Sequence, residues 1–491
     1  MMSAPICVVW KRPIHRLLPL ALTLVVCQPG QVLAVDGLPG LTLQHQLSAA
    51  VLVMAAAPLA SAAVKPTAVV NMQDLSLRQA LTLALERNLQ FAQTLEEIEQ
   101  ARSFLQESRS VLGPMVSLTG SQANVTANLR AQGFPSVAGP GGKPLFATLN
   151  GPYNTFDARL RLTQAVFDAN HSHLAESSQR RVQQAEHQRL AVRDQLLIAT
   201  ALAYITAQQS DAALAAAQAN VALANELGKL ARDQRSSGIA TGVDVARAET
   251  RVAQEQLALT QARSDQALSL LRLKRLLGLP AGEPIRLASG LDYERRPTPG
   301  VEEAVAKAMA QRQEIQMEDA RVSAAEEAVL AAGSEGLPVV ALEADAGPSG
   351  ITPTQTVYGT RTVGISVSVP LFTNGMLDAH RDRAKSLLRA ARMAQEDTRR
   401  QVEEDVHMAL LAVGTSAEQV QVAQTTVTLS ERLLELARDR FKSGVADNLE
   451  VFDALTALTT AQSRQIEATA AYNAARANMY AAMGDSHAFG F

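Results

Sequence analysis

Apolar and polar positions follow two different periods along this chain, so the sequence predicts both helices and strands. Long stretches with the helical period of about 3.6 residues occur in both halves of the chain, and many of their apolar positions are alanine or leucine. They predict helices over about 77–112, 168–237, 243–278, 301–335, 373–443 and 449–484. A helix of about 70 residues would be roughly 105 Å long. We therefore expect an elongated helical rod or tube, with each pair of shorter helices stacked end to end beside a long one.

Between these helices the apolar residues alternate with polar ones at every second position, which is the period of a β-strand. This alternation gives each segment one apolar and one polar face. It suits a barrel strand with lipid on one side and water on the other, and it suits equally a soluble sheet packed on one face. Segments of this kind are 125–130, 157–163, 340–346 and 362–371.

The segments next to the strands are rich in glycine and proline, which indicates loops. Ala131–Tyr153 and Gly347–Tyr358 are expected to be external loops. Aromatic residues near the predicted strand ends are suggestive of a membrane-interface girdle: Phe134, Phe146, Tyr153, Phe156 and Tyr358.

The chain repeats itself. Ala231–Gly238 matches Ala437–Gly444, and the residues that follow each segment also correspond. Upstream, Ala80 and Ala84 correspond to Ala304 and Ala308. We predict an internal duplication in which each copy runs helix, two strands, long helix, turn, helix. The expected divisions are a leader (1–63), a first repeat (71–279), a linker (280–300), a second repeat (301–484) and a C-terminal tail (485–491).

The N-terminal region has the order of a secretory signal, in which basic residues precede an apolar run, Leu17–Val26. Cleavage is expected after about Ala34 or after Ala63. Two alternatives stay open. A second apolar run, Leu47–Val64, is just long enough for a transmembrane helix, and Cys27 is a candidate for lipidation.

Composition narrows the functional classes. The chain has 491 residues, of which 47% are hydrophobic and only 4% aromatic, and its formal net charge is −3. Such a chain is not wholly disordered, and it lacks the basic surplus of a nucleic-acid binder. Both cysteines, Cys7 and Cys27, lie in the leader, so no disulfide framework or cysteine metal site is expected. We expect no cofactor and no enzyme activity, since no nucleophile or phosphate-binding motif is found.

His171-Ser172-His173 is a weak candidate for metal binding. Residues at i and i+2 of a helix do not face each other, so an exposed helix start is the preferred interpretation. No metal site is predicted.

Four strands are too few to close a barrel, because about eight is the smallest workable number. An open sheet edge cannot lie in lipid, where backbone groups have no water to bind. If the strands lie in a membrane, several chains must therefore pool them.

This arrangement resembles the TolC-like outer-membrane efflux channel family. The resemblance is carried by the helix start Leu77–Asn88, by the strand-to-helix junctions Gln164–Asp168 and Val369–Phe372, and by two helix turns, Ser237–Val245 and Ser443–Ala454. It covers roughly residues 71–484. It implies a mostly α fold: a homotrimer in the outer membrane of a Gram-negative-type cell, with four strands per chain in a shared 12-stranded barrel and a periplasmic α-helical tunnel. The implied partners are a periplasmic adaptor (membrane fusion) protein, an inner-membrane transporter and outer-membrane lipid.

The resemblance also implies where function lies. The adaptor would dock at the helix turns, on Ser237, Gly238, Thr241, Ser443, Gly444 and Asp447. Acidic residues after the turns would form a cation-favouring ring at the periplasmic aperture: Asp244, Glu450 and Asp453. Thr241…Asp244 and Asp447…Glu450 are also ordinary helix starts, so capping alone explains them equally simply. Asp453 has no capping explanation.

The sequence departs from the family at one position. Some relatives have a basic residue two positions after the second turn glycine, which ties the closed tip to its neighbour, and this chain has Ala446 there. Arg438, Arg440 and Lys442 are nearby alternatives.

The expected function is a passive exit duct of a tripartite efflux pump that exports small molecules. The alternatives are the duct of a type I protein-secretion system and a soluble periplasmic coiled-coil scaffold.

Overall fold

The computed structural model describes residues 74–133, 140–141, 148–443, 445 and 448–486. The predicted leader, its cleavage sites and both cysteines lie outside the described residues, as do Phe134, Phe146, Gly444, Ala446 and Asp447. The chain divides into two units, Met1–Val70 and Asn71–Phe491, and everything below concerns the second unit.

The second unit is mostly helical, and its long helices match the predicted ones. The two longest are α4 (Ala169–Ser236, 68 residues) and α8 (Met376–Lys442, 67 residues). Each turns back into a shorter helix of 35 residues, α5 (Gly242–Leu276) and α9 (Asn448–Ala482). At 1.5 Å per residue α4 and α8 are each about 100 Å long.

The predicted helices 77–112 and 301–335 are each divided in two, which the sequence analysis did not foresee. The observed helices are α2 (Leu77–Arg87), α3 (Leu89–Ser110), α6 (Val301–Gln311) and α7 (Gln313–Ser334). The single residues between them, Asn88 and Arg312, have extended backbone. Each lies eight residues after an equivalent alanine, Ala80 or Ala304, so the break is a shared feature of the two repeats.

Local polar contacts explain the break at Asn88. Its Oδ1 accepts a hydrogen bond from the backbone N–H of Phe91 at 3.1 Å, which caps α3. Its Nδ2 donates to the carbonyl of Leu276 at 3.0 Å, which fixes the break to the end of α5. At the second break Arg312 makes no capping bond and is held instead by ion pairs, described below.

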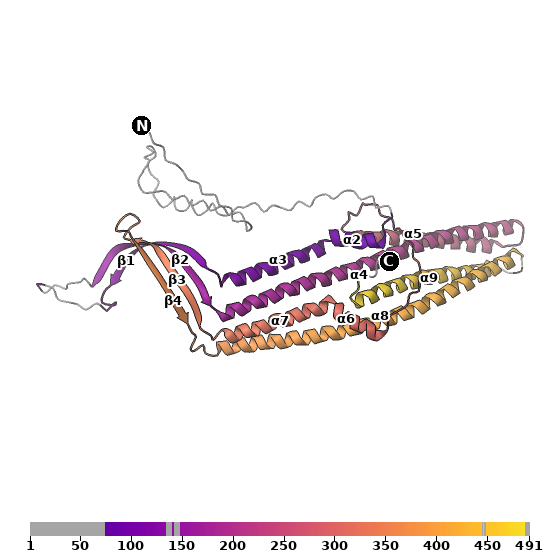
Figure 1. The fold of residues 1–491 in the computed structure, drawn as a ribbon. Coiled ribbons are helices and arrows are strands. Elements are labelled where there is room, and N and C mark those ends of the chain that lie inside the picture. Colours follow the sequence, from indigo (N-terminus) through magenta and orange to yellow (C-terminus); the bar gives the residue numbers. More distant parts are fainter. Residues whose placement is uncertain (1–73, 134–139, 142–147, 444, 446–447, 487–491) are drawn as a thin grey trace, which may run out of the picture. The chain divides into compact units, whose positions relative to one another are not determined.

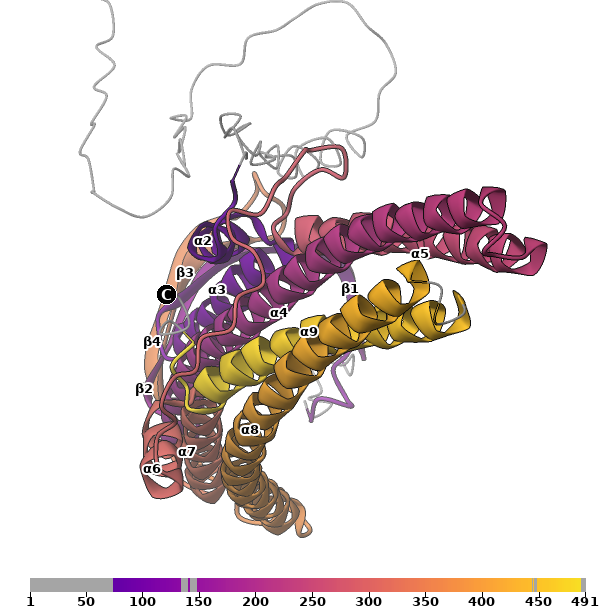
Figure 2. The same ribbon diagram turned by 90° about the vertical axis from the view of Figure 1, so that its right-hand side faces the viewer.

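The short helices lie end to end beside the long ones, as predicted. Figure 1 shows α3, α2 and α5 in succession along α4, and α7, α6 and α9 along α8. α4 also packs on α7 and α9, which joins the two repeats. Figure 2 shows the α4–α5 hairpin beside the α8–α9 hairpin.

α4 contains an 18-residue window apolar enough to cross a membrane, but 44% of it is buried inside the structure. The buried apolar residues of α4, such as Leu197, Ala201 and Ile205, contribute to this helix packing.

Two tyrosines anchor non-helical segments to the helices. Tyr204 and Tyr472 are each 1% exposed. Tyr204 Oη donates to the carbonyl of Leu75 at 2.9 Å, and Tyr472 Oη donates to the carbonyl of Glu294 at 3.1 Å. A buried phenol needs such a partner, so these contacts stabilise both the start of the described chain and the predicted inter-repeat linker.

Four strands form one antiparallel sheet in chain order: β1 (Met115–Asn128), β2 (Leu149–Phe167), β3 (Val339–Gly350) and β4 (Tyr358–Ser368). The four predicted strands are thus confirmed, but their ends differ. The expected loops are shorter than predicted, because β2 already begins at Leu149 and β3 continues to Gly350. Val369 and Leu371, assigned to a strand by their alternation, come after the end of β4.

The register divides the sheet into an apolar face and a polar face. One row across all four strands is Val116, Leu162, Ala344 and Val363. The neighbouring row, on the opposite face, is Ser117, Arg161, Asp345 and Thr362. The apolar face is uncovered within the chain: Leu118, Val363 and Ile365 are 77%, 74% and 72% exposed. β1 and β4 each have one edge that no described strand of this chain pairs.

Candidate functional site

The two helical hairpins end in turns that contain most of the predicted site residues. In the first turn Gly238 has φ +74°, a left-handed conformation that glycine adopts at little cost where a helix ends. Ser237 caps α4, and its backbone N–H donates to the carbonyl of Asp233 at 3.2 Å. In the second turn the N–H of Ser443 donates to the carbonyl of Asp439 at 3.0 Å in the same way. The described parts of the two turns therefore have the same helix ending.

Asp244 is a capping residue. Its Oδ2 accepts hydrogen bonds from Thr241 Oγ1 at 2.7 Å and from the Thr241 backbone N–H at 2.9 Å. The bond from the Thr241 hydroxyl, with the backbone bond second, lowers the pKa of Asp244. The capping interpretation of Thr241 and Asp244 is confirmed, because both hydrogen bonds of the capping box form at the start of α5.

Glu450 and Asp453 lie one turn apart on α9 and differ in their surroundings. Glu450 is half-buried, and its Oε1 is 3.5 Å from Nη1 of Arg440. Asp453 is exposed and makes neither a hydrogen bond nor an ion pair with the residues that the structure describes. Of the three predicted acidic residues, Asp453 is thus the one whose charge is left to solvent or to another molecule.

Two buried amides join the hairpins, and the sequence analysis did not identify them. Gln234 Nε2 donates to the carbonyl of Phe441 at 3.0 Å, and Asn448 Nδ2 donates to the carbonyl of Asp244 at 3.0 Å. Gln234 is 7% and Asn448 1% exposed. The sequence contained one signal for Asn448. This polar residue precedes the buried Val451 by one helical turn, so it lies on the same buried face of α9.

Packing and charge contacts support these two hydrogen bonds. Leu227 of α4 belongs to the apolar cluster of the α8–α9 hairpin, which includes Leu434 and Phe441. Arg438 Nη2 lies 3.6 Å from Glu226 Oε2, across the same boundary. Arg438 and Arg440, named as alternatives to the missing basic residue, therefore both have carboxylate partners within the chain, whereas Lys442 is exposed.

The polar face of the sheet contains a charge cluster. Arg159 binds Asp157 at 2.9 Å, forms a short ion pair with Asp345 on the next strand, and donates to Thr360 Oγ1 at 3.1 Å. Ser366 donates to Glu343 at 3.0 Å on the same face. This face is hydrophilic and internally paired, as the wall of a water-filled passage should be.

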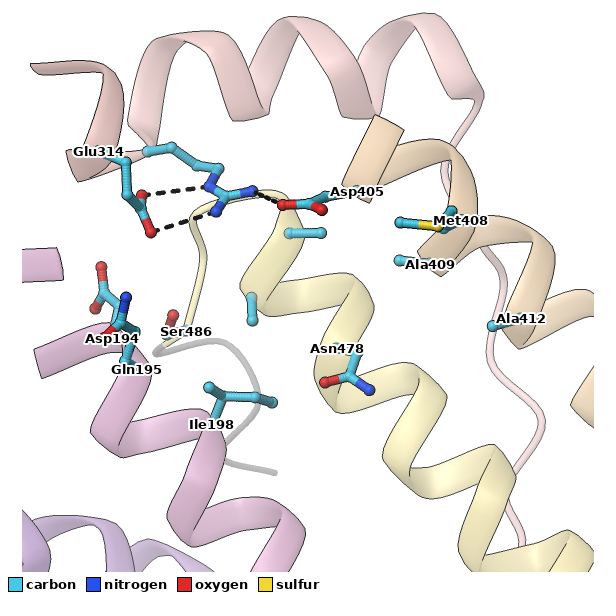
Figure 3. Close-up of a pocket in the computed structure, with 13 residues that line it drawn as sticks. Asp194, Gln195, Ile198, Glu314, Asp405, Met408, Ala409, Ala412, Asn478 and Ser486 are labelled. Atoms are coloured by element: carbon cyan, nitrogen blue, oxygen red, sulfur yellow. Dashed lines mark hydrogen bonds and ion pairs between the residues drawn. The ribbon is translucent and has the colours of Figure 1, made fainter. Parts of the chain in front are cut away.

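A pocket of about 430 Å³ lies where Arg312 divides α6 from α7 (Figure 3). Arg312 binds Asp405 of α8 at 2.7 Å and Glu314 at 3.3 Å. Burial alone would lower the pKa of Arg312, but the hydrogen bonds that its guanidinium donates to these carboxylates, together with their negative charges, outweigh burial and raise the pKa. The network fastens the helix break to α8, which is a structural role.

The two adjacent histidines point to different carboxylates. His171 Nδ1 is 2.7 Å from Asp168, the residue that caps α4, and His173 Nδ1 is 2.9 Å from Glu327 of α7. The contacts tie the start of α4 to its surroundings. In the described ranges no group of three or more histidine, cysteine or acidic residues is placed to hold a metal ion.

Comparison with known proteins gives consistent matches. The family model described as "Outer membrane efflux protein" matches residues 80–279 and 304–485. The probable efflux pump outer membrane protein TtgC of Pseudomonas putida is 25% identical over 419 residues, which cover 84% of this chain and 83% of TtgC. The alkaline protease secretion protein AprF of Pseudomonas aeruginosa is 24% identical over 410 residues, covering 82% and 83%. Among solved structures, the outer membrane protein VceC of Vibrio cholerae has TM-score 0.70 at 17% identity, covering 83% of this chain and 96% of VceC.

Proposed function

The chain belongs to the outer membrane efflux protein family, and on that premise we propose that three copies of it form the exit duct of a tripartite efflux pump. It is an outer-membrane efflux channel with a large periplasmic helical part. The energy for export would come from an inner-membrane transporter, and this chain would supply the water-filled path. A periplasmic adaptor would join the two.

The open sheet is the observation that supports a trimer. β1 and β4 each have one edge that is not paired by any strand in the described part of the chain, and an exposed apolar face runs across all four strands. In lipid those edges must be paired, and one chain cannot pair them. Because β1 and β4 run antiparallel to each other, β4 of one copy can pair with β1 of the next. Three copies would give 12 strands, enough for a closed barrel.

The periplasmic aperture would lie at the two helix turns. Glu450 and the exposed Asp453 would be repeated around the threefold axis as an acidic ring that favours cations. Asp244 caps its helix and would add its charge to the same ring. Ser237, Gly238, Thr241 and Ser443 would contact the adaptor, together with Gly444 and Asp447, which lie outside the described residues. The exposure of Ser237, Gly238, Thr241 and Ser443 is compatible with this role.

The two-repeat division would serve this assembly. Repeats 71–279 and 301–484 would each contribute one β-hairpin and one helical hairpin. The two segments of the family match, 80–279 and 304–485, support this division. The linker would only connect them.

Membrane extraction and accumulation assays test the proposal. The full chain, expressed with its own leader, should stay with the outer-membrane fraction in buffer, dissolve only with detergent, and have the mass of three chains in that detergent. It should also lower the accumulation of a fluorescent dye in cells that lack their own efflux ducts, provided a compatible adaptor and transporter are present. A monomer that is released without detergent would contradict the proposal.

The match to AprF keeps a protein-secretion duct as a second candidate. The two functions share one fold and differ in cargo. Co-purification would separate them, because a proton-driven transporter indicates small molecules, whereas an ATP-driven transporter together with a secreted protein indicates polypeptide cargo. The scaffold alternative does not suit a family of outer-membrane proteins or a sheet with an uncovered apolar face.

A further inference from the structure

One basic residue lies on the apolar face of the sheet. Arg361 is on β4, directly opposite Ala346 of β3, in the row that also contains Leu160 and Leu118. It is exposed. Its neighbours on the same face of β4, Val363 and Ile365, are 74% and 72% exposed. The guanidinium therefore projects from the side of the sheet that faces lipid in an outer-membrane channel.

The sheet offers no carboxylate to neutralise Arg361. The four described strands contain three acidic residues, Asp157, Glu343 and Asp345, and the register places all three on the polar face. β1, the strand that a neighbouring copy would place beside β4, has the sequence MVSLTGSQANVTAN and contains no acidic residue. A charge partner for Arg361 must therefore come from outside the barrel wall.

The height of Arg361 indicates what that partner is. Arg361 lies near the turn between β3 and β4, which is the end of the sheet away from the helices (Figure 1). The exposed apolar residues continue from Val363 to Leu371, next to the helices. From Arg361 to Ser368, the end of β4, a strand tilted by roughly 40° rises about 18 Å. The exposed Val369 and Leu371 continue the apolar band toward the helices, and such a band is about 25 Å tall in a membrane barrel. Arg361 is thus at the outer border of that band, where a lipid-facing arginine is tolerated best.

We propose that Arg361 binds a phosphate group of an outer-leaflet lipid headgroup and so helps to fix the height of the channel in the membrane. A guanidinium offers two parallel N–H donors that match two phosphate oxygens, a geometry that lysine cannot reproduce. Val363, on the same face of β4, and Ala346, directly opposite on β3, would contact the acyl chains of the same lipid. The inference depends on the lipid-facing sheet and not on the cargo.

The test uses the intact detergent-purified channel and three variants. Arg361→Gln removes the charge, and Arg361→Lys keeps the charge but not the paired donors. Arg161→Gln is the matched control, because Arg161 is also an exposed strand arginine but lies on the polar face, opposite Ser117. The probes are bisphosphorylated lipid A, the same lipid A without phosphate, and inorganic phosphate. Binding is measured by native mass spectrometry and by the shift in the melting temperature of the channel.

Arg361→Gln should weaken lipid A binding about fivefold, as expected for one basic residue at an anionic lipid surface. Arg361→Lys should lie between Arg361→Gln and the wild type, and Arg161→Gln should bind as the wild type does. Dephosphorylated lipid A should bind the wild type as weakly as bisphosphorylated lipid A binds Arg361→Gln, and inorganic phosphate should not compete.

Equal lipid A affinity of the wild type and Arg361→Gln would overturn the proposal, and so would an equal loss in Arg161→Gln. Competition by inorganic phosphate would show a general anion site instead of a lipid site, and would also refute it. Each variant is first sized in detergent. A failure of the wild type to form trimers would refute the proposed function, whereas unchanged lipid binding by an intact trimer refutes this inference alone.

Discussion

Replacing Asn448 by alanine should loosen the contact between the two helical hairpins at their tips. The substitution removes the 3.0 Å hydrogen bond from Asn448 Nδ2 to the carbonyl of Asp244. Because Asn448 is 1% exposed, water cannot replace the lost donor without entering the interface. A net cost of about 1 kcal/mol per chain is expected for one such bond.

In the proposed trimer this cost would act three times. If the three tips separate together, the substitution shifts the free energy difference between closed and separated tips by about 3 kcal/mol toward the separated state. This is a change of roughly 150-fold in the equilibrium constant for tip separation. If each tip moves alone, the factor is about fivefold per chain. Single-channel recording in planar bilayers distinguishes these cases, since the variant should show longer or more frequent high-conductance periods than the wild type.

Asn473→Ala is the matched control. Asn473 lies on the same helix and also donates from Nδ2 to an aspartate carbonyl, that of Asp292, at 2.9 Å, but it is only half-buried and lies far along α9 from the tip. It should leave conductance unchanged. If Asn448→Ala conducts as the wild type does, or if both variants change it equally, the amide does not hold the hairpins together.

Three further outcomes are expected. Glu450→Ala combined with Asp453→Ala should reduce the cation preference of the channel, measured from reversal potentials in a salt gradient. An unchanged cation preference would contradict the proposed acidic ring. Arg312→Ala should lower the free energy of unfolding by about 2 kcal/mol, measured in thermal melts, because it leaves the carboxylates of Asp405 and Glu314 without their ion-pair partner. The control Arg400→Ala removes an exposed ion pair with Glu396 and should lower it by less than about 0.5 kcal/mol. Thr241→Ala should cost about 1 kcal/mol at neutral pH through the lost cap. The folded-state pKa of Asp244 is lowered. The part of the stability cost that is due to the Asp244 carboxylate should therefore be present above the unfolded pKa of about 4 and should disappear as pH falls through the folded-state pKa. A stability difference that does not depend on pH would contradict this role of the carboxylate.

The repeating pattern made much of this fold predictable. Helices of about 70 residues and strands with alternating faces leave strong periodic signals, and the duplication confirmed each signal with a second copy. The interruption at Arg312 left no such signal, and the one at Asn88 left only the weak signal of a residue type that commonly caps helices. The break at Asn88 is fixed by a contact with Leu276, far away in the sequence, and Arg312 is held by Asp405 on another helix. Local periodicity cannot contain such partners.

The strand ends show a similar limit. Gly151 and Pro152 are turn residues by local chemistry, yet they lie within β2, at a register irregularity between the pairs Asn150–Ala127 and Tyr153–Val125. Strand pairing on both sides of them continues the strand past this irregularity. At the hairpin tips the sequence identified the capping pair Thr241 and Asp244, because a capping box is local. It did not identify Gln234 and Asn448, whose acceptors lie on the other hairpin.

Each repeat supplies one β-hairpin, and β2 of the first pairs with β3 of the second inside the chain. In the proposed trimer β4 would meet β1 of the next copy, so a second-repeat strand again adjoins a first-repeat strand. The wall would then consist of six similar units around the pore, with alternate seams inside and between chains. Cutting the chain within the linker should therefore leave two halves that still find each other and rebuild the same ring from six pieces.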